Sequence, residues 1–380
     1  MQKKYLMSPG PTQVPLRASL AFTDPIIHHR TQEYKEIFRQ VNENLKYLFC
    51  TSNDVLTFTS SGTGAMEAAV VNLLSKGDKA LVVRGGKFGE RWSEICEVYG
   101  VEVTNIDVEW GCAVEPGLIE EALKKDPSIK AVFTTLCETS TGVVNDIKRI
   151  GEIVAPFPTI LVVDAISGLG AQEMPTDQWK VDVCVSGSQK GLMIPPGLAF
   201  ASVSEKAWKL AESSDLPKYY LSMIKARKGL SKDQTAFTPA VSLVCALNET
   251  LKMMREEGLG NILARHERLA KACRAGVTAL GLELFAKSPA NNCTAIKVPE
   301  GLDGKVIKSK FSKDYGITIA GGQGHIEGKI FRISHLGYAD TFDVVMAISC
   351  LEMVLSDSGR DVEFGKGVAA AQEILKKGEV

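Results

Sequence analysis

The chain has 380 residues, of which 45% are hydrophobic and 23% charged, and its formal net charge at pH 7 is −1. This length suits a large and a smaller domain, and the balanced charge argues against nucleic acid or a membrane surface as a partner. Its nine cysteines form no C-x-x-C pair, which predicts a protein without disulfides or a bound metal. No apolar run approaches the roughly 20 residues of a membrane span. Together these features predict a complete cytoplasmic protein.

Residues 1–20 are expected to form an N-terminal arm. The stretch SPGPTQVP (8–15) is too rich in proline and glycine for regular structure, so it should be extended. Apolar residues then recur at helical spacing over residues 33–49, which predicts the first helix.

A large domain is predicted over residues 21–258, where strand-like and helical segments alternate. The strand-like segments lie at 55–58, 79–83, 101–106, 130–136, 159–164, 181–186 and 198–203. The helical segments between them lie at 63–74, 88–100, 117–125 and 147–155. This alternation is typical of βαβ units and predicts an α/β fold, with a mostly parallel seven-stranded sheet that helices cover on both faces.

A smaller α+β domain is predicted over residues 259–380. Two long helical segments, at about 239–257 and 259–280, lead into it. Beyond residue 290 the pattern predicts strands at 293–298, 317–320 and 330–336 and helices near 303–315 and 341–356.

The carboxyl end of the first predicted strand carries a glycine-containing turn that leads into a helix. In the sequence TSSGTG, Ser61, Gly62 and Thr63 would aim backbone N–H groups and hydroxyls at an anion such as a phosphate. The same short pattern is also compatible with an ordinary capped helix start.

Two charged residues follow later strands. Asp164 comes directly after four apolar strand residues, so its carboxylate would be partly desolvated and needs a cation, unless it is a helix cap or lies in a surface turn. Lys190 lies among glycines at the end of the next strand, where it either meets that need or extends to solvent. The stretch CETSTG (137–142) adds small hydroxyl side chains at a neighbouring strand end.

These features should converge, because ligands of open parallel sheets bind at the carboxyl ends of the strands. A lysine amine, a buried carboxylate and a phosphate turn together suit pyridoxal 5′-phosphate. The lysine would form a Schiff base with the aldehyde, and the carboxylate would keep the pyridine nitrogen protonated. To move a substrate proton, the lysine needs a pKa far below its usual value of roughly 10.4, which burial and nearby positive charge provide.

Six stretches resemble one known family. They are SGSQKGLMIPPG, VVDAISGLG, SSGTGAMEAAV, ETSTGV, MSPGPTQVP and IFRISHLGYAD. In order and spacing they are similar to the class V aminotransferases of the alanine–glyoxylate and serine–pyruvate (or serine–glyoxylate) group, from about residue 5 to 355. The resemblance implies the fold type I of pyridoxal-phosphate-dependent transferases.

The resemblance also implies roles for individual residues. Lys190 corresponds to the Schiff-base lysine and Asp164 to the partner of the pyridine nitrogen. The remaining cofactor positions are Ser61, Gly62 and Thr63 at the phosphate, Phe88 stacked on the ring, Thr139 beside the ring oxygen, and Gln189 near the phosphate.

Substrate binding is likewise implied by the resemblance. Arg332 corresponds to the arginine that binds the substrate carboxylate, for which a planar guanidinium is well suited. Gly10 and Pro11 of the arm are expected to line the same pocket. Thr238 corresponds to a residue that reaches the phosphate in a partner subunit, which implies a homodimer with shared sites. Thr235 falls where some relatives have tyrosine, so no contact with the partner's cofactor is assigned to it.

The substrate is less constrained by the sequence. No second cation stands in an obvious motif position, which favours alanine or serine as the amino donor and glyoxylate or pyruvate as the acceptor. If Arg30, Arg84, Arg227 or Lys225 enters the pocket, aspartate or 2-aminoethylphosphonate becomes an alternative substrate.

Two other functions fit the sequence less well. Cysteine desulfuration needs a mobile, activated cysteine, but Cys293 has no neighbouring cation in the sequence and Phe88 holds the stacking position. A structural subunit that keeps the fold without activity is disfavoured by the intact lysine, aspartate and phosphate turn. No role is assigned to His28, His29 or His325.

Overall fold

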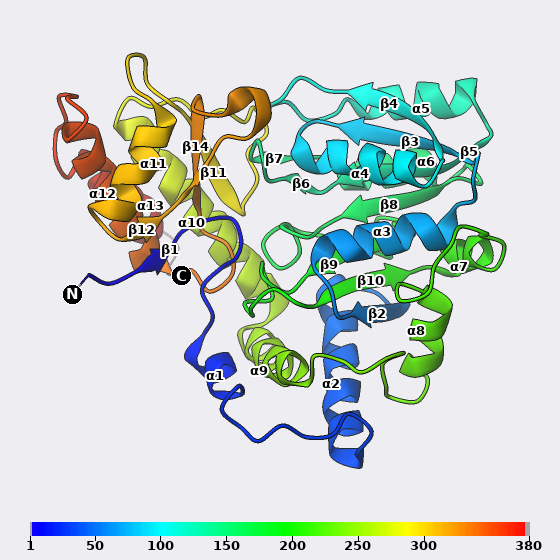
Figure 1. Ribbon diagram of the computed structural model, residues 1–380. Coiled ribbons are helices and arrows are strands. Elements are labelled where there is room, and N and C mark those ends of the chain that lie inside the picture. The colour runs from blue at the N-terminus through cyan, green and yellow to red at the C-terminus, as the bar shows by residue number, and fades with distance from the viewer. Residues whose placement is uncertain (1, 377–380) are drawn as a thin grey trace.

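The structure, a computed structural model, describes residues 2–376 (Figure 1). Its largest element is a seven-stranded sheet in the order β2-β10-β9-β8-β5-β3-β4. The strands are β2 (Asp54–Phe58), β3 (Lys79–Arg84), β4 (Glu102–Asp107), β5 (Ile129–Thr135), β8 (Ile160–Asp164), β9 (Val183–Gly187) and β10 (Ala199–Val203). Only β10 runs antiparallel to its neighbours in this sheet. The predicted mostly parallel, seven-stranded sheet is confirmed.

Helices cover both faces of this sheet. One hydrophobic core forms against α2 (Gln32–Phe49), α5 (Pro116–Lys125), α6 (Ile147–Val154) and α9 (Val241–Glu257). The other forms against α3 (Gly62–Leu73), α4 (Lys87–Val98), α7 (Glu205–Ala211) and α8 (Met223–Leu230). Successive strand residues alternate between the two cores, as Val132 and Phe133 of β5 do. This is why the central strands read as continuous apolar runs.

The C-terminal part forms a third core around a small antiparallel sheet, β11-β14-β13. Its strands are β11 (Cys293–Lys297), β13 (Ala320–Gly321) and β14 (Ile330–Ser334), and its helices are α10 (Leu259–Ala279), α11 (Gly304–Lys313), α12 (Thr341–Ser356) and α13 (Lys366–Lys376). Figure 1 shows this part beside the large sheet. The smaller α+β part of the fold is thus as predicted.

The N-terminal arm differs in detail from the prediction. Its β1 (Tyr5–Leu6) pairs in parallel with β12 (Ile317–Thr318), and Met7 packs in the C-terminal core. The stretch 8–15, which was predicted to be extended, contains no helix, and a short helix, α1 (Leu16–Leu20), begins directly after Pro15. The predicted strand 317–320 is divided between β12 and β13, because its first half pairs with β1 and its second with β14.

The predicted domain boundaries at residues 20 and 258 stay predictions. Met1 of the predicted arm and residues 377–380 of the predicted C-terminal domain lie outside the described residues. The helix α10 contributes Ile262 to a core of the large sheet and Leu269 to the C-terminal core. Within residues 2–376, no helix combines the length and apolar character needed to cross a membrane.

Candidate active site

A pocket lies at the carboxyl ends of the central strands. It is lined by Ser61, Gly62, Thr63, Phe88, Arg91, Thr139, Asp164, Ile166, Ser167, Gln189 and Lys190. The structure therefore brings together eight of the nine residues predicted to bind the cofactor. They come from segments that are far apart in the sequence but follow β2, β3, β5, β8 and β9 at one edge of the sheet.

Lys190 follows β9 and points toward the N-terminal arm. Its Nζ donates a hydrogen bond to the Pro9 carbonyl at 2.5 Å, and the Thr12 hydroxyl donates to the Lys190 carbonyl at 3.0 Å. Burial lowers the pKa of the amine to about 8, although the charge of Asp164 opposes this shift. Part of the amine is therefore unprotonated near neutral pH, as a nucleophile or base requires.

Gly10 of the arm lies against the lysine. A Cβ built on Gly10 would be 2.3 Å from Lys190 Nζ, and Gly10 has a φ of +117°. The backbone conformation therefore favours glycine here, and a larger residue would displace the Lys190 amine. The arm thus contacts Lys190 at Gly10, whereas the predicted role of Gly10 and Pro11 in substrate binding stays a prediction.

Asp164 ends β8 and is 5% exposed. Its Oδ1 accepts a hydrogen bond from the Ile166 N–H at 2.7 Å, and no ion pair reaches it from any residue in the described part of the chain. Burial raises its pKa to about 7, and nearby Glu138 adds to this shift. A buried carboxylate without a cation fits a protonated ring nitrogen, which would repay its desolvation.

The phosphate turn is formed by the start of α3. Ser61 is the N-cap residue but makes no side-chain capping hydrogen bond. The Gly64 N–H donates to the Ser61 carbonyl, and the N–H groups of Gly62 and Thr63, which line the pocket, have no partner among the described residues. The Oε1 atom of Gln189 is buried and has no hydrogen-bond partner in the structure. An unsatisfied amide beside free N–H groups indicates a polar ligand. The free N–H groups fit the phosphate of pyridoxal phosphate, whereas Gln189 Oε1 is an acceptor and would pair with a donor of the ligand.

Phe88 is held in place by a buried carboxylate that the sequence analysis missed. The N–H groups of Phe88 and Gly89, in the first turn of α4, donate to Glu138 Oε2 at 3.1 and 2.9 Å. The hydroxyl and N–H of Ser140 donate to Glu138 Oε1 at 2.5 and 3.1 Å. Burial raises the pKa of Glu138, and these hydrogen bonds oppose that shift. Glu138 thereby fixes the start of α4 and the orientation of Phe88.

Thr139 links the pocket to Arg332 of β14. Its hydroxyl is 2.5 Å from the Ser167 hydroxyl, and its carbonyl accepts from Arg332 Nη1 at 2.6 Å. Arg332 Nε and Nη2 donate to the Gly321 carbonyl at 3.1 and 2.7 Å. A guanidinium has five N–H groups, so two remain for a ligand. Arg332 does not line the pocket itself, but it is hydrogen-bonded to Thr139, which does.

The structure does not bring the other candidate cations into the pocket. Arg30 bonds to Gln234, Arg84 pairs with Asp107, Arg227 pairs with Asp54 and Glu205, and Lys225 lies over the Tyr219 ring at 3.5 Å. His325 stacks on Trp110 with centroids 4.2 Å apart, and His28 lies 4.5 Å from His29. None of these residues lines the pocket. Arg91 does line it, and no sequence pattern had indicated it.

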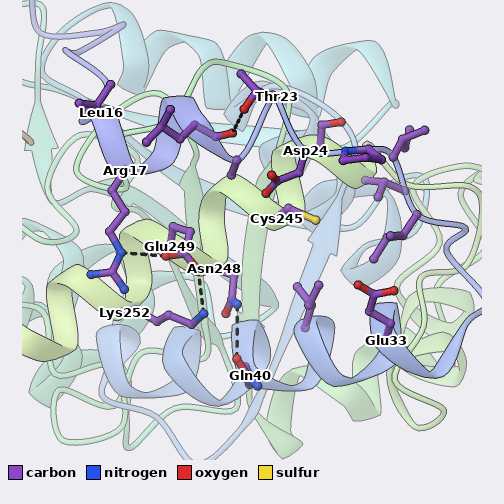
Figure 2. Close-up of a pocket in the computed structure, with 18 residues that line it drawn as sticks. Leu16, Arg17, Thr23, Asp24, Glu33, Gln40, Cys245, Asn248, Glu249 and Lys252 are labelled. Carbon is purple, nitrogen blue, oxygen red and sulfur yellow. Dashed lines mark hydrogen bonds and ion pairs between the residues drawn. The ribbon is translucent and has the colours of Figure 1, made fainter.

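Thr238 lies outside the cofactor pocket. It lines a separate small pocket with Thr57, Tyr220 and Phe237, and the Thr235 hydroxyl donates to the Phe237 carbonyl at 2.5 Å. A larger hollow of ≈ 1170 Å³ lies between α1, α2 and α9 (Figure 2). Its polar side chains largely satisfy one another, as Arg17 and Lys252 do at Glu249. It holds none of the predicted catalytic residues.

Comparison with known proteins agrees with this geometry. The family model for class V aminotransferases matches residues 5–344. A protein named as the soluble hydrogenase 42 kDa subunit of Anabaena cylindrica is 46% identical, over 98% of this chain and 99% of that protein. The L-aspartate–glyoxylate aminotransferase of Paracoccus denitrificans is 38% identical over 96% and 94%, and the serine–glyoxylate aminotransferase of Hyphomicrobium methylovorum is 38% identical over 98% and 95%.

A solved structure also matches the whole chain. The ureidoglycine–glyoxylate aminotransferase of Bacillus subtilis superposes with a TM-score of 0.95, at 29% identity, over 99% of both chains. The sequence match and the shared fold type I imply pyridoxal phosphate as the cofactor, which the donors of the pocket fit. The chain belongs to the class V aminotransferases.

Proposed function

We propose that this aminotransferase moves the amino group between a small amino acid, alanine or serine, and a 2-oxo acid, glyoxylate or pyruvate. The observation that carries the proposal is that Lys190 and Asp164 line one pocket, with pKa values of about 8 and about 7. When bound, pyridoxal phosphate supplies an aldehyde that takes up amines and a ring that accepts electrons.

The proposed residues have distinct tasks in this reaction. The amine of Lys190 would hold the cofactor through its aldehyde and, when free, would move the proton of the substrate Cα. The carboxylate of Asp164 would face the ring nitrogen and favour its protonated form. The two free N–H groups of Arg332 bind the substrate carboxylate and so orient the Cα–H bond toward the lysine.

A small neutral donor is supported by the positions of the cations. Arg30, Arg84, Arg227 and Lys225 are all engaged away from the pocket. Among the pocket residues only Arg91 and Lys190 carry positive charge, and Arg91 contacts the phosphate turn. Aspartate and 2-aminoethylphosphonate remain the alternatives, because one relative is named for aspartate.

Cysteine desulfuration is disfavoured by the state of Cys293. This cysteine lies in β11, is fully buried, and has its pKa raised to about 11 by burial. A protonated thiol in a strand is neither mobile nor a good nucleophile. A different alternative is a structural subunit that retains the fold, because one relative is named as a subunit of a soluble hydrogenase.

A single-turnover screen tests the function. The purified enzyme loaded with pyridoxal phosphate is mixed with single amino acids and its visible spectrum is followed. We expect serine and alanine to convert the cofactor at least roughly 10-fold faster than aspartate or 2-aminoethylphosphonate, since an unpaired second anion is excluded. Faster conversion by aspartate would contradict the neutral donor. Sulfide release from free cysteine would indicate desulfuration, and a protein that stays colourless with added pyridoxal phosphate would indicate an inactive subunit.

We also propose a homodimer with shared sites in the cytoplasm. Thr238 does not line the cofactor pocket of its own chain, as expected if it serves a partner's phosphate. Large apolar side chains nearby and around the hollow of Figure 2 are exposed, among them Tyr219 at 71%, Leu16 at 72% and Ile26 at 76%. A second copy of the chain would cover such surface. All nine cysteines are free thiols, which suits a reducing compartment.

Replacing Gly10 with alanine tests the contact between the arm and Lys190. The new methyl group would occupy the place of the Lys190 amine and would strain a backbone with φ +117°. We expect the rate of cofactor attachment to fall roughly 10-fold or more, measured as the growth of visible absorbance after pyridoxal phosphate is added. The matched variant Gly281→Ala, at a positive φ with no neighbour within 4 Å, carries only the backbone strain. Equal effects of the two substitutions would contradict the steric argument.

A further inference from the structure

We propose that Arg91 is a phosphate-binding residue of the cofactor pocket. The inference rests on the proposed position of the cofactor between Lys190 and the start of α3. Neither the sequence motifs nor the resemblance to the family indicated this residue.

Arg91 lies one helical turn after Phe88 and reaches the phosphate turn. Its Nη1 donates to the Thr63 hydroxyl at 3.3 Å, and its guanidinium carbon is 4.9 Å from the centroid of the Phe88 ring. The side chain is thus braced by the ring that is proposed to stack on the cofactor. The guanidinium of Arg91 therefore lies beside the turn that is proposed to bind the phosphate.

The charge of the pocket favours such a residue. The phosphate of the cofactor is an anion, yet the side chains of Ser61, Thr63 and Gln189 are all neutral. Among the described residues that line the pocket, two are cations, and one of them, Lys190, is proposed to bind the aldehyde. Within this lining, Arg91 is therefore the cation left to pair with the phosphate. A desolvated anion is stabilised strongly only when a cation or several N–H groups face it.

Arg91 is available for this role. Across residues 2–376, no carboxylate lies within ion-pair distance of its guanidinium, although Glu90 beside it pairs with Lys87. Because the Thr63 oxygen accepts from Arg91, the hydroxyl proton of Thr63 remains free to donate to an anion. Arginine also offers a planar pair of N–H groups that matches phosphate oxygens.

The charge of Arg91 also acts on the reacting groups. It contributes to lowering the pKa of both Asp164 and Lys190. Its loss should therefore raise the pKa of the Lys190 amine. The pH dependence of the rate should therefore shift when Arg91 is replaced, whereas a purely structural role of Arg91 would leave it unchanged.

The test compares binding of pyridoxal phosphate and of pyridoxal, which has the same ring without the phosphate. Cofactor-free wild type, Arg91→Gln, Arg91→Lys and the control Arg149→Gln are titrated with each compound by absorbance and fluorescence. Arg149 is an exposed helix arginine paired with Glu152. We expect Arg91→Gln to raise the Kd for pyridoxal phosphate roughly 10- to 100-fold, as for one charged hydrogen-bonding partner, and to leave the Kd for pyridoxal unchanged. Arg91→Lys should recover part of the loss, and the control should match wild type.

Three results would overturn the inference. An unchanged Kd for pyridoxal phosphate in Arg91→Gln would remove the role. Equal losses for pyridoxal phosphate and pyridoxal, together with a lower Tm, would show that Arg91 only supports Phe88 and α4. If wild type itself does not prefer pyridoxal phosphate over pyridoxal, the proposed phosphate turn fails, and with it Arg91. A rise in the pH midpoint of the rate in Arg91→Gln, with the control unchanged, would support the inference independently.

Discussion

Replacing Lys190 with alanine is expected to abolish transamination while non-covalent cofactor binding persists. The substitution removes the amine that is proposed to bind the aldehyde and to move the Cα proton. It leaves intact the start of α3, the buried carboxylate of Asp164 and the ring of Phe88, which line the same pocket. General acid–base catalysis alone is worth roughly 100- to 10,000-fold in rate, so loss of both tasks should reduce turnover by more than this.

The measurement pairs steady-state turnover with equilibrium dialysis of pyridoxal phosphate. The control is Lys124→Ala, a lysine on α5 that is 65% exposed and pairs with Glu120. Adding a small primary amine should partly restore the rate of Lys190→Ala, because the missing group is a base at a defined place. Turnover at the wild-type level in Lys190→Ala would end the proposal, whatever the cofactor affinity.

The sheet and its ligand edge were accessible from the sequence because local patterns determine them. Strands buried on both faces are continuous apolar runs, and residues that follow them must meet at one edge. Asp164 and Lys190 could therefore be placed in one pocket although 26 positions separate them (190 − 164). Neither the short α1 nor the division of residues 317–320 into β12 and β13 was predicted. The division could not be predicted because the pairing of β12 with β1 depends on where the distant arm lies.

Glu138 and Arg91 were missed for a related reason. Glu138 was visible in the stretch CETSTG, but its importance comes from N–H groups 49 and 50 positions earlier in the chain. Arg91 reads as one of several charges on the amphipathic α4, and only the approach of Thr63 from another helix gives it a function. A buried carboxylate at a strand end was a usable signal for Glu138. No comparable local signal existed for Arg91.

Asparagine at position 164 is expected to have opposite effects on catalysis and on the stability of the cofactor-free protein. The amide has nearly the same shape but no charge, so it does not hold the ring nitrogen protonated. The rate should fall roughly 100-fold or more, as when one preorganised charge is removed from a reacting centre. Lys190 should still attach the cofactor, since its own contacts with Pro9 and the arm are unchanged.

The stability effect follows from the raised pKa of Asp164. In the unfolded chain a carboxyl of this kind loses its proton near pH ~3.9, whereas burial holds the pKa in the folded chain at about 7. Below both pKa values the carboxyl group is neutral in the folded and the unfolded state, so its ionisation does not lower the free energy of unfolding. Between them the folded state binds the extra proton, so stability falls as the pH rises, and above the folded pKa the full cost is present.

Cofactor-free Asp164→Asn should therefore have a higher Tm than wild type at about pH 8, and the difference should shrink as the pH falls toward ~4. Thermal unfolding of both proteins across this range measures it, with Asp361→Asn at an exposed position as the control. Loading with pyridoxal phosphate should reverse the order at about pH 8, because the bound ring provides the cation that the wild-type carboxylate lacks. A variant that is less stable at every pH, with and without cofactor, and fully active would show that Asp164 is a structural residue with no contact to the ring.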